Sequence, residues 1–394
     1  MKEKNRFKIL TLNKISLAGL KRFPREQYEV ASEILHPDAI VLRSQNMHDM
    51  EMPDTLLAVA RAGAGVNNIP IERCSAAGIP VFNAPGANAN AVKELVLTAI
   101  FLAARNICQA ADHVKNLQLD GKELDKAVEA GKKQFVGFEI PGKTLGVVGL
   151  GAIGVEVANA ALDLGMKVVG FDPQITVRRA WQMSSGVEQA SSLDDLFSRA
   201  DILTAHVPMT DGTRHLVNAE RLGLMRDGSV LLNFARAPIV DEDAVAAALE
   251  NGKLHAFVTD FPSAPLKDNP RVTALPHLGA STYEAEENCA IMVANNLRDF
   301  LENGNIRHSV NFPEAIMPRN DGQRLIVANA NVPNMVGQIS TALADAKLNI
   351  ADLLNKSRDD LAYTLVDIDG AVNSATAEQI GNIGGVLSVR TIAG

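Results

Sequence analysis

Residues 143–172 read KTLGVVGLGAIGVEVANAALDLGMKVVGFD. The apolar run at 144–150 is typical of a buried parallel strand, and it leads directly into a turn rich in glycine. A helical pattern follows and ends near Gly165, after which a second apolar run at 167–171 ends in Asp172. This order of strand, glycine turn, helix, strand and acid predicts a dinucleotide-binding unit. An ordinary glycine turn of another α/β protein is the alternative.

The glycines of the turn are expected to serve three purposes. Gly149 permits the sharp turn, Gly151 lets the backbone approach a pyrophosphate, and Gly154 lets the helix lie close to the strand. Free N–H groups at the start of the helix favour a phosphate. A carboxylate at Asp172 suits the ribose hydroxyls of NAD and repels the 2′-phosphate of NADP, so NAD is the predicted cofactor.

The composition limits the class of protein. A chain of 394 residues with 47% hydrophobic and 21% charged residues predicts a globular protein of two or three domains. The net charge of −8 argues against binding to nucleic acid or to anionic membranes. Three cysteines without paired spacing predict reduced thiols and no metal site. No signal peptide or membrane span is recognised, so a cytoplasmic location is expected.

Helices and strands alternate on both sides of the glycine turn, which predicts a parallel sheet covered on both faces. The last part of the chain has the order strand, helix, strand, strand, helix, strand, which is typical of a ferredoxin-like domain. Glycine, proline and asparagine cluster before it and predict a linker. The expected organisation is a substrate-binding domain at 1–88 and 284–310, a nucleotide-binding domain at 89–283, a linker at 311–322 and a separate domain at 323–394.

Polar residues follow several of the predicted strands. His277 can exchange a proton near neutral pH, and the planar fork of Arg236 can bind a carboxylate through two hydrogen bonds. Arg43 follows another strand and is a candidate anion contact, with a surface arginine as the alternative. The N–H groups of the loop at 63–68 could hold a carboxylate or phosphate, although a plain turn is an equal interpretation.

Several segments together resemble the D-isomer-specific 2-hydroxyacid dehydrogenases. They are VLRS (41–44), GIPVFNAP (78–85), GLGAIG (149–154), HVPMTDGTRHLVN (206–218), NFARAPIVDE (233–242), VTDFP (258–262) and PHLGASTYEAEENCA (276–290). The resemblance covers nearly the whole chain. It is similar to the branch of the family that oxidises 3-phospho-D-glycerate, and the final domain is similar to an ACT domain, a regulatory module that binds serine in many such enzymes.

The resemblance implies an α/β fold in which a Rossmann-type doubly wound parallel sheet is inserted in a flavodoxin-like substrate domain, followed by a ferredoxin-like ACT domain. It implies NAD-dependent oxidation of 3-phospho-D-glycerate to 3-phosphooxypyruvate, the first step of L-serine biosynthesis, in a homodimer or homotetramer with serine as a regulator. One alternative is a dehydrogenase of another small D-2-hydroxy acid, such as glycerate or hydroxypyruvate. The other is an NAD-sensing protein without catalytic activity.

The resemblance also implies a role for individual residues. Arg236 would bind the substrate carboxylate and 2-oxo group, and His277 would be the acid/base. The remaining substrate contacts would be Arg43, Ala64, Gly65 and Val66. The cofactor contacts would be Gly149, Gly151, Ile153, Gly154, Asp172, Pro208, Thr213, Ala235 and Asp260. Asn331 and Asn349 would contact serine in the final domain.

The sequence departs from the family pattern behind the histidine. Relatives pair it with a glutamate, and here Ala264 or Pro265 falls where that glutamate is expected. Asp260 and Asp268 are both near in sequence, and either could supply the missing carboxylate to His277.

Two further departures concern binding. Gln45 stands where a second phosphate-contacting arginine often lies in relatives. Asn329 and Asn334 replace the His and Gly of relatives that serine inhibits strongly, whereas Asn331 and Asn349 keep serine binding plausible.

Overall fold

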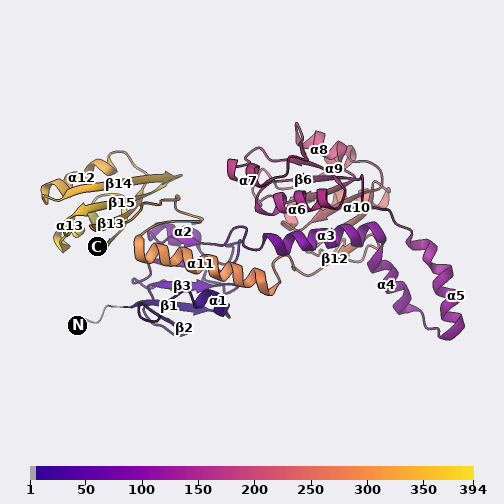
Figure 1. Ribbon diagram of the computed structural model, residues 1–394, viewed down its shortest axis with the longest axis horizontal. Coiled ribbons are helices and arrows are strands. Elements are labelled where there is room, and N and C mark those ends of the chain that lie inside the picture. The colour runs from indigo at the N-terminus through magenta and orange to yellow at the C-terminus, as the bar shows by residue number, and fades with distance from the viewer. Residues whose placement is uncertain (1–5) are drawn as a thin grey trace. The chain divides into compact units, whose positions relative to one another are not determined.

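The computed structural model describes residues 6–394 (Figure 1). The chain divides into two compact units. Unit 1 consists of Met1–Asn88 and Tyr283–Gly394, and unit 2 is Ala89–Thr282. The C-terminal residues after 323, expected to form a separate domain, belong to unit 1.

Unit 2 contains a seven-stranded parallel sheet with the order β12-β11-β10-β9-β6-β7-β8. The chain order reverses between β6 and β9, which is the switch point of a Rossmann-type sheet, so the predicted fold of this unit is confirmed. The strands are β6 (Thr144–Val148), β7 (Lys167–Phe171), β8 (Val187–Gln189), β9 (Ile202–Ala205), β10 (Ser229–Asn233), β11 (Leu254–Thr259) and β12 (Val272–Ala274).

Helices cover both faces of this sheet, which explains why its central strands are apolar on every side (Figure 1). One face packs against α3 (Ala89–Arg105) and α6 (Ala152–Asp163). The other packs against α8 (Leu193–Arg199), α9 (Ala219–Leu224) and α10 (Glu242–Glu250). The short helices α7 (Val177–Gln182) and η2 (Ala237–Ile239) follow β7 and β10.

A helical hairpin extends from the end of α3 (Figure 1). It consists of α4 (Ile107–Asn116), α5 (Gly121–Gly131) and the 3₁₀ helix η1 (Lys132–Phe135). Asn106 separates α3 from α4 because it adopts the left-handed conformation, with a φ of 51°. No residue of α4 is fully buried, so the hairpin is a peripheral part of unit 2.

Unit 1 begins with a five-stranded parallel sheet of order β2-β1-β3-β4-β5, the order of flavodoxin-like folds. Its strands are β1 (Phe7–Leu12), β2 (Tyr28–Ala31), β3 (Ala39–Leu42), β4 (Ala58–Arg61) and β5 (Val81–Phe82). Its helices are α1 (Leu17–Leu20), α2 (Ile71–Ala76) and the long α11 (Tyr283–Asn303). The helix α11 returns the chain from unit 2 and buries Val293, Leu297 and Leu301 against this sheet.

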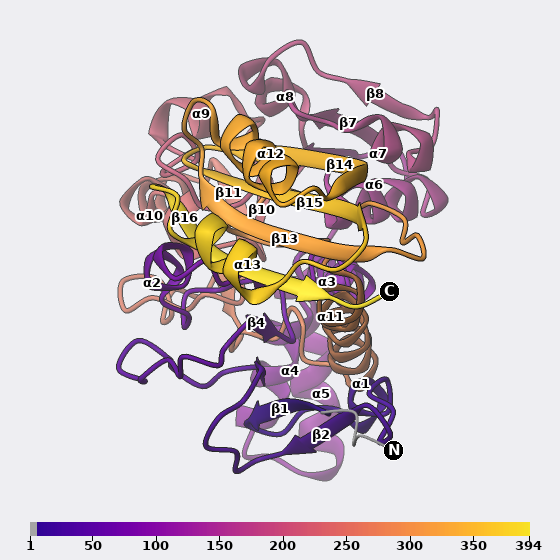
Figure 2. The same cartoon turned by 90° about the vertical axis from the view of Figure 1, so that its left-hand side faces the viewer.

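The C-terminal residues form a four-stranded antiparallel sheet of order β14-β15-β13-β16. The elements are β13 (Gln323–Ala330), α12 (Met335–Asp345), β14 (Asn349–Arg358), β15 (Leu361–Asp369), α13 (Ser374–Gly381) and β16 (Val386–Ile392), which confirms the predicted βαββαβ order. Both helices lie on one face of the sheet (Figure 2).

The two faces of β13 have different partners, as the alternation of a strand dictates. Leu325 and Val327 pack with α12 in a small core of the C-terminal part. Ile326 and Ala328 point the opposite way and join the core that contains Phe300 of α11. The C-terminal sheet therefore shares a hydrophobic core with the rest of unit 1.

The segment at 311–322, predicted to be a linker, connects α11 to β13 and is partly buried. Phe312, Ala315 and Met317 are buried in the shared core. Ile306 and Ala315 also pair as an isolated antiparallel bridge. The segment connects two elements as the composition predicts, but its apolar side chains pack against partners that are remote in sequence.

A buried ion pair fixes the C-terminal sheet to this segment. The Nε and Nη2 atoms of Arg324 donate to the two carboxylate oxygens of Asp367 over 2.6 and 2.8 Å. Nη1 donates to the carbonyl oxygens of Asn303 and Met317, both at 2.9 Å, and Nη2 also donates to that of Pro318 at 2.8 Å. All five N–H groups of the guanidinium are thereby satisfied, which a charge removed from water requires.

Two more groups of the C-terminal sheet bind the end of α11. Arg390 Nη2 donates to the carbonyl oxygen of Phe300 at 2.6 Å, and Nη1 donates to that of Leu301 at 3.3 Å. The hydroxyl of Tyr363 donates to the carbonyl oxygen of Gly304, directly after the helix, at 2.8 Å. Since the last carbonyls of a helix lack partners within it, these donors satisfy them.

Within residues 6–394, no helix is long and apolar enough to cross a membrane.

We predict that Asp367→Asn destabilises unit 1, because it leaves the buried Arg324 charge without its counter-ion. The expected loss is about 3 kcal/mol in the free energy of unfolding, measured by urea denaturation. The control is Asp268→Asn, whose exposed carboxylate pairs only with Lys267. It should change the unfolding free energy by less than about 0.5 kcal/mol. Equal unfolding curves for both variants would contradict the structural role of Asp367.

Candidate functional site

The turn between β6 and α6 has no room for side chains at two of its glycines. Gly149 has a φ of +87°, and a Cβ there would lie 2.7 Å from the carbonyl oxygen of His206. A Cβ on Gly154 would lie 1.9 Å from the carbonyl oxygen of Gly149. The missing Cβ at Gly149 permits the turn, and the missing Cβ at Gly154 lets α6 approach the strand closely.

Gly151 is different, because a Cβ placed there would meet nothing within 4 Å. Gly151 is the N-cap of α6, and no side chain accepts a hydrogen bond from the helix start. Ile153 lies in the first turn of the same helix. Open space beside uncapped N–H groups and a positive helix dipole fits the pyrophosphate of a dinucleotide.

The carboxylate of Asp172 is held against this turn. One oxygen accepts from the N–H of Leu150 and the other from the N–H of Gln174, both at 2.8 Å. Each carboxylate oxygen can accept a further hydrogen bond, so ribose hydroxyls can still bind. Of the two nearby arginines, Arg179 donates to Gln182 within its own helix at 2.8 Å, and Arg178 is exposed.

The other sequence candidates of unit 2 follow neighbouring parallel strands, so they share one edge of the sheet. After β9, the hydroxyl of Thr213 donates to the carbonyl oxygen of Pro208 at 2.6 Å. After β10, the N–H of Ala235 donates to Asn233 at 3.2 Å, and the exposed Arg236 donates to the carbonyl oxygen of Ala235 at 2.6 Å.

His277 follows β12 at the same edge and is exposed. Its ring lies 4.9 Å from the ring of Phe261, with an interplanar angle of 49°. Its carbonyl oxygen accepts from the hydroxyl of Ser281 at 3.5 Å. The imidazole therefore rests on an aromatic ring that directly follows Asp260 in the chain.

The structure distinguishes the two acids that the sequence left open. Asp260 is 1% exposed, and its Oδ2 accepts from the N–H of Gly279 at 3.0 Å. Its Oδ1 is buried and has no hydrogen-bond partner in the described part of the chain. Burial raises the pKa of Asp260, whereas the Gly279 N–H and the charge of His277 lower it. Asp268 instead lies at the surface and pairs with Lys267. Asp260 is thus the acid beside the His277 loop.

Unit 1 gathers positive charge at the ends of β3 and β4. These strands pair in parallel with Leu42 opposite Arg61. Arg43, the residue after Leu42, therefore lies at the same sheet edge as Arg61. Arg61 Nε donates to the carbonyl oxygen of Arg43 at 3.0 Å, and Arg43 Nη1 lies 2.6 Å from Glu286 Oε1. Arg61 was not among the sequence candidates. Its position at a strand end, just before the glycine loop, is the signal that could have identified it.

The loop after β4 has free donors. Within residues 6–394, no acceptor binds the N–H groups of Ala64, Gly65 or Val66. The loop is held in place by Asn83, which donates to the carbonyl oxygen of Ala64 at 2.6 Å. Such a row of N–H groups beside two guanidinium groups fits an anion. The exposed Gln45 is fixed by its main chain, whose N–H donates to Asn13 at 2.6 Å.

The two asparagines assigned to serine are not brought together within one chain. Asn331 donates to the carbonyl oxygen of Asp359 at 3.0 Å, near the turn between β14 and β15. Asn349 donates to Asp369 at 2.7 Å, at the opposite end of these strands. Asn329, one of the departures from relatives, is buried, and its Oδ1 has no partner among the described residues.

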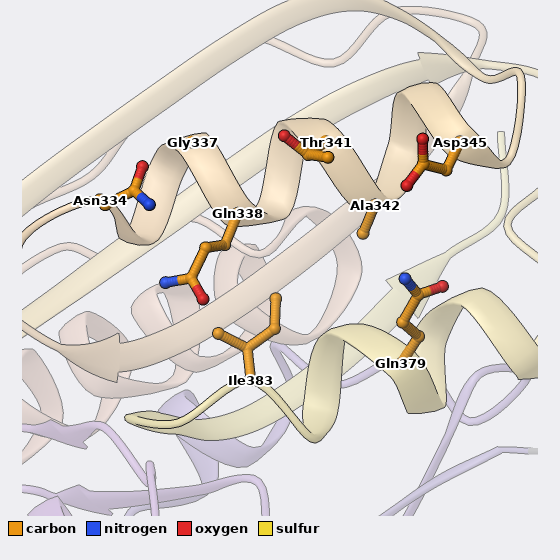
Figure 3. Close-up of a pocket in the computed structure, with 8 residues that line it drawn as sticks. All are labelled: Asn334, Gly337, Gln338, Thr341, Ala342, Asp345, Gln379 and Ile383. Atoms are coloured by element: carbon orange, nitrogen blue, oxygen red, sulfur yellow. The ribbon is translucent and has the colours of Figure 1, made fainter.

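A groove of about 340 Å³ lies between α12 and α13 (Figure 3). Most of its lining side chains are polar. The lining residues are Asn334, Gly337, Gln338, Thr341, Ala342, Asp345, Gln379 and Ile383. Nothing in residues 6–394 groups three or more His, Cys, Asp or Glu side chains in a way that could hold a metal ion.

We predict opposite outcomes for two alanine substitutions in the turn. Gly151→Ala should fold with wild-type stability, because its Cβ meets open space, but should bind NAD about tenfold or more weakly. Gly154→Ala should lose about 1–3 kcal/mol of unfolding free energy, because its Cβ meets the Gly149 carbonyl. Calorimetric NAD binding and urea unfolding measure the two effects. Tight NAD binding by Gly151→Ala would show that the pyrophosphate does not lie there.

Known proteins are similar to this chain along most of its length. The family model described as D-isomer specific 2-hydroxyacid dehydrogenase, NAD binding domain, matches residues 97–279. The D-3-phosphoglycerate dehydrogenase of Methanocaldococcus jannaschii is 35% identical over 335 residues, which cover 83% of this chain and 61% of that protein. The protein of the same name from Haemophilus influenzae is 33% identical over 368 residues, which cover 90% of this chain and 86% of that protein.

The fold is also similar to a solved structure. The crystal structure of NAD⁺-bound 3-phosphoglycerate dehydrogenase from Entamoeba histolytica has a TM-score of 0.62 and 25% sequence identity to this chain. The match covers 78% of this chain and 99% of that one. The chain thus spans 61% of the length of the Methanocaldococcus relative and most of the length of the other two. It belongs to the D-isomer-specific 2-hydroxyacid dehydrogenase family, with its NAD-binding domain at residues 97–279.

Proposed function

We propose that this chain is an NAD-dependent dehydrogenase that oxidises 3-phospho-D-glycerate to 3-phosphooxypyruvate, the first step of L-serine biosynthesis. The observation that carries the proposal is the pair of guanidinium groups at adjacent strand ends, Arg43 and Arg61, beside a loop with free N–H groups. A substrate with a carboxylate alone needs fewer cations. The second anionic group of a phosphorylated acid accounts for this additional positive charge.

The reaction divides between residues of unit 2 and the cofactor. Arg236 binds the substrate carboxylate and stabilises the developing 2-oxo group through its planar fork. His277 takes the proton of the C2 hydroxyl as the C–H bond breaks. Bound NAD⁺ supplies the acceptor for the hydride, so the alcohol loses one hydride and one proton and becomes a ketone.

Asp260 is the carboxylate that we assign to His277 in place of the missing glutamate. It lies beneath the loop that carries His277, and its Oδ1 is buried without a partner in the described structure. A buried acceptor of this kind is costly, unless a donor reaches it when the site is complete. An N–H group of His277 is a donor that this carboxylate can orient, and the resulting imidazolium is stabilised by its charge.

A second candidate substrate is an unphosphorylated D-2-hydroxy acid. Glu286 supports it, because this carboxylate already pairs with Arg43 and reduces the net positive charge of the site. Gln45 in place of a second arginine supports it as well. A comparison of turnover with 3-phospho-D-glycerate and with D-glycerate separates these two possibilities.

Self-association and regulation are further parts of the proposal. Several apolar side chains on α3 and the helical hairpin are exposed, which supports a homodimer or homotetramer. They are Phe101, Ile107, Val114 and Leu119. Serine binding at Asn331 and Asn349 stays a prediction. Because the two lie at opposite ends of β14, a single chain would offer a ligand only one of them. The cytoplasmic location also stays a prediction.

We predict that the chain reduces NAD⁺ with 3-phospho-D-glycerate and turns over D-glycerate much more slowly, followed by NADH absorbance. His277→Ala should lower kcat by about 10²- to 10⁴-fold, because the proton acceptor is lost, with unchanged NAD affinity. His215→Ala is a matched control, since His215 is an exposed histidine of the same unit. Equal turnover of both acids would reject the phosphorylated substrate, and an active His277→Ala variant would reject its catalytic role.

The pH profile tests the carboxylate. In Asp260→Asn, kcat should fall about tenfold or more, because the imidazole loses its orienting partner. The rise of kcat/KM with pH should move to lower pH, since a neutral amide no longer favours the protonated imidazole. Asp268→Asn, a removal of charge at the exposed alternative, should leave the profile unchanged. A shift in Asp268→Asn instead would reverse the assignment.

A further inference from the structure

Arg43 already has an anionic partner within unit 1. Its Nη1 lies 2.6 Å from Oε1 of Glu286, which stands in the first turn of α11. The two side chains are 36% and 40% exposed, so water reaches the pair and Glu286 has room to turn away. An anion that binds at Arg43 Nη1 must compete with this carboxylate.

The charges around this pair form a small cluster. Cys289 lies one turn further along α11, and its thiol is buried. Burial raises the pKa of this thiol, Arg43 and Arg61 lower it, and Glu286 raises it. Arg43 joins the cluster, because its carbonyl oxygen accepts from Arg61 Nε at 3.0 Å and its guanidinium pairs with Glu286 at 2.6 Å.

The charge of the incoming anion decides the competition. A phosphate monoester carries about −1.5 to −2 at pH 7, whereas the carboxylate of Glu286 carries one negative charge. Exchanging one carboxylate for another monoanion gains no Coulomb energy, but exchanging it for a phosphate does. An unphosphorylated hydroxy acid has no group for Arg43 and can leave the ion pair intact.

We propose that Glu286 is a specificity-determining residue, a carboxylate that holds Arg43 until a dianionic phosphate displaces it. The inference rests on the proposed function for the identity of the substrate, and concerns the same anion site. With Glu286 in place, a monoanion gains nothing by replacing this carboxylate at Arg43, and phosphate binds less tightly than it would to an unpaired Arg43. Glu286 thus trades affinity for selection by charge.

The test is Glu286→Gln, which removes the charge and keeps the shape. Calorimetry with inorganic phosphate should show about two- to fivefold tighter binding than in the wild type, the range expected for a partly exposed ion pair. The KM for 3-phospho-D-glycerate should fall by a similar factor. Acetate, a monoanion, should compete with phosphate in Glu286→Gln and not in the wild type, because only the variant leaves Arg43 without its own carboxylate. Equal competition by acetate in both proteins would contradict selection by charge. Glu287→Gln is the matched control, because the neighbouring Glu287 is exposed and loses the same charge. It should bind phosphate as the wild type does.

A second variant separates the effect of the lost charge from an effect of misfolding. Glu286→Asp keeps the charge on a side chain one methylene shorter, so its phosphate affinity should lie between those of the wild type and Glu286→Gln. Unchanged NAD affinity in each variant shows that the chain is folded. Phosphate binding in Glu286→Gln that is equal to or weaker than in the wild type overturns the proposal. Tighter phosphate binding without turnover of 3-phospho-D-glycerate would support this anion site and reject the proposed function.

Discussion

A Cβ on residue 154 would lie 1.9 Å from the carbonyl oxygen of Gly149. The nucleotide-binding turn depends on this close approach of α6 to the end of β6. It allows α6 to begin directly above the end of β6, so that the first N–H groups of the helix face the sheet edge. The same turn presents the Leu150 N–H to Asp172, which fixes the carboxylate at the end of the next strand. A larger residue at 154 would separate helix from strand and misplace all of these groups together.

Features encoded over short distances were predictable from the sequence. The glycine turn and the βαββαβ order depend on neighbouring residues and on hydrophobic periodicity, and both are present. The segment at 311–322 shows the limit. Its two prolines, two asparagines and one glycine indicate a linker locally, but Phe312 and Met317 are buried in a core built from segments remote in sequence. Local composition carries no information about such distant partners.

The candidate site divides in the same way. Arg236 and His277 could be placed at one edge of the sheet from their strand-end positions alone, because parallel strands end at a common edge. The choice between Asp260 and Asp268 depended on burial, which two acids close in sequence do not reveal. Arg61 was missed because apolar strands often end in a charged residue that has no role in binding. The separation of Asn331 from Asn349 required the pairing of β14 with β15.

The capped end of α11 has a mechanical consequence. This helix of 21 residues is about 30 Å long, and carbonyls at its far end are gripped by Arg324 and Arg390 of the C-terminal sheet. Its near end carries Glu286, the partner of Arg43. The helix is continuous between these two ends. The helix thus joins the C-terminal sheet at one end to the Arg43 ion pair at the other, through one continuous element of unit 1.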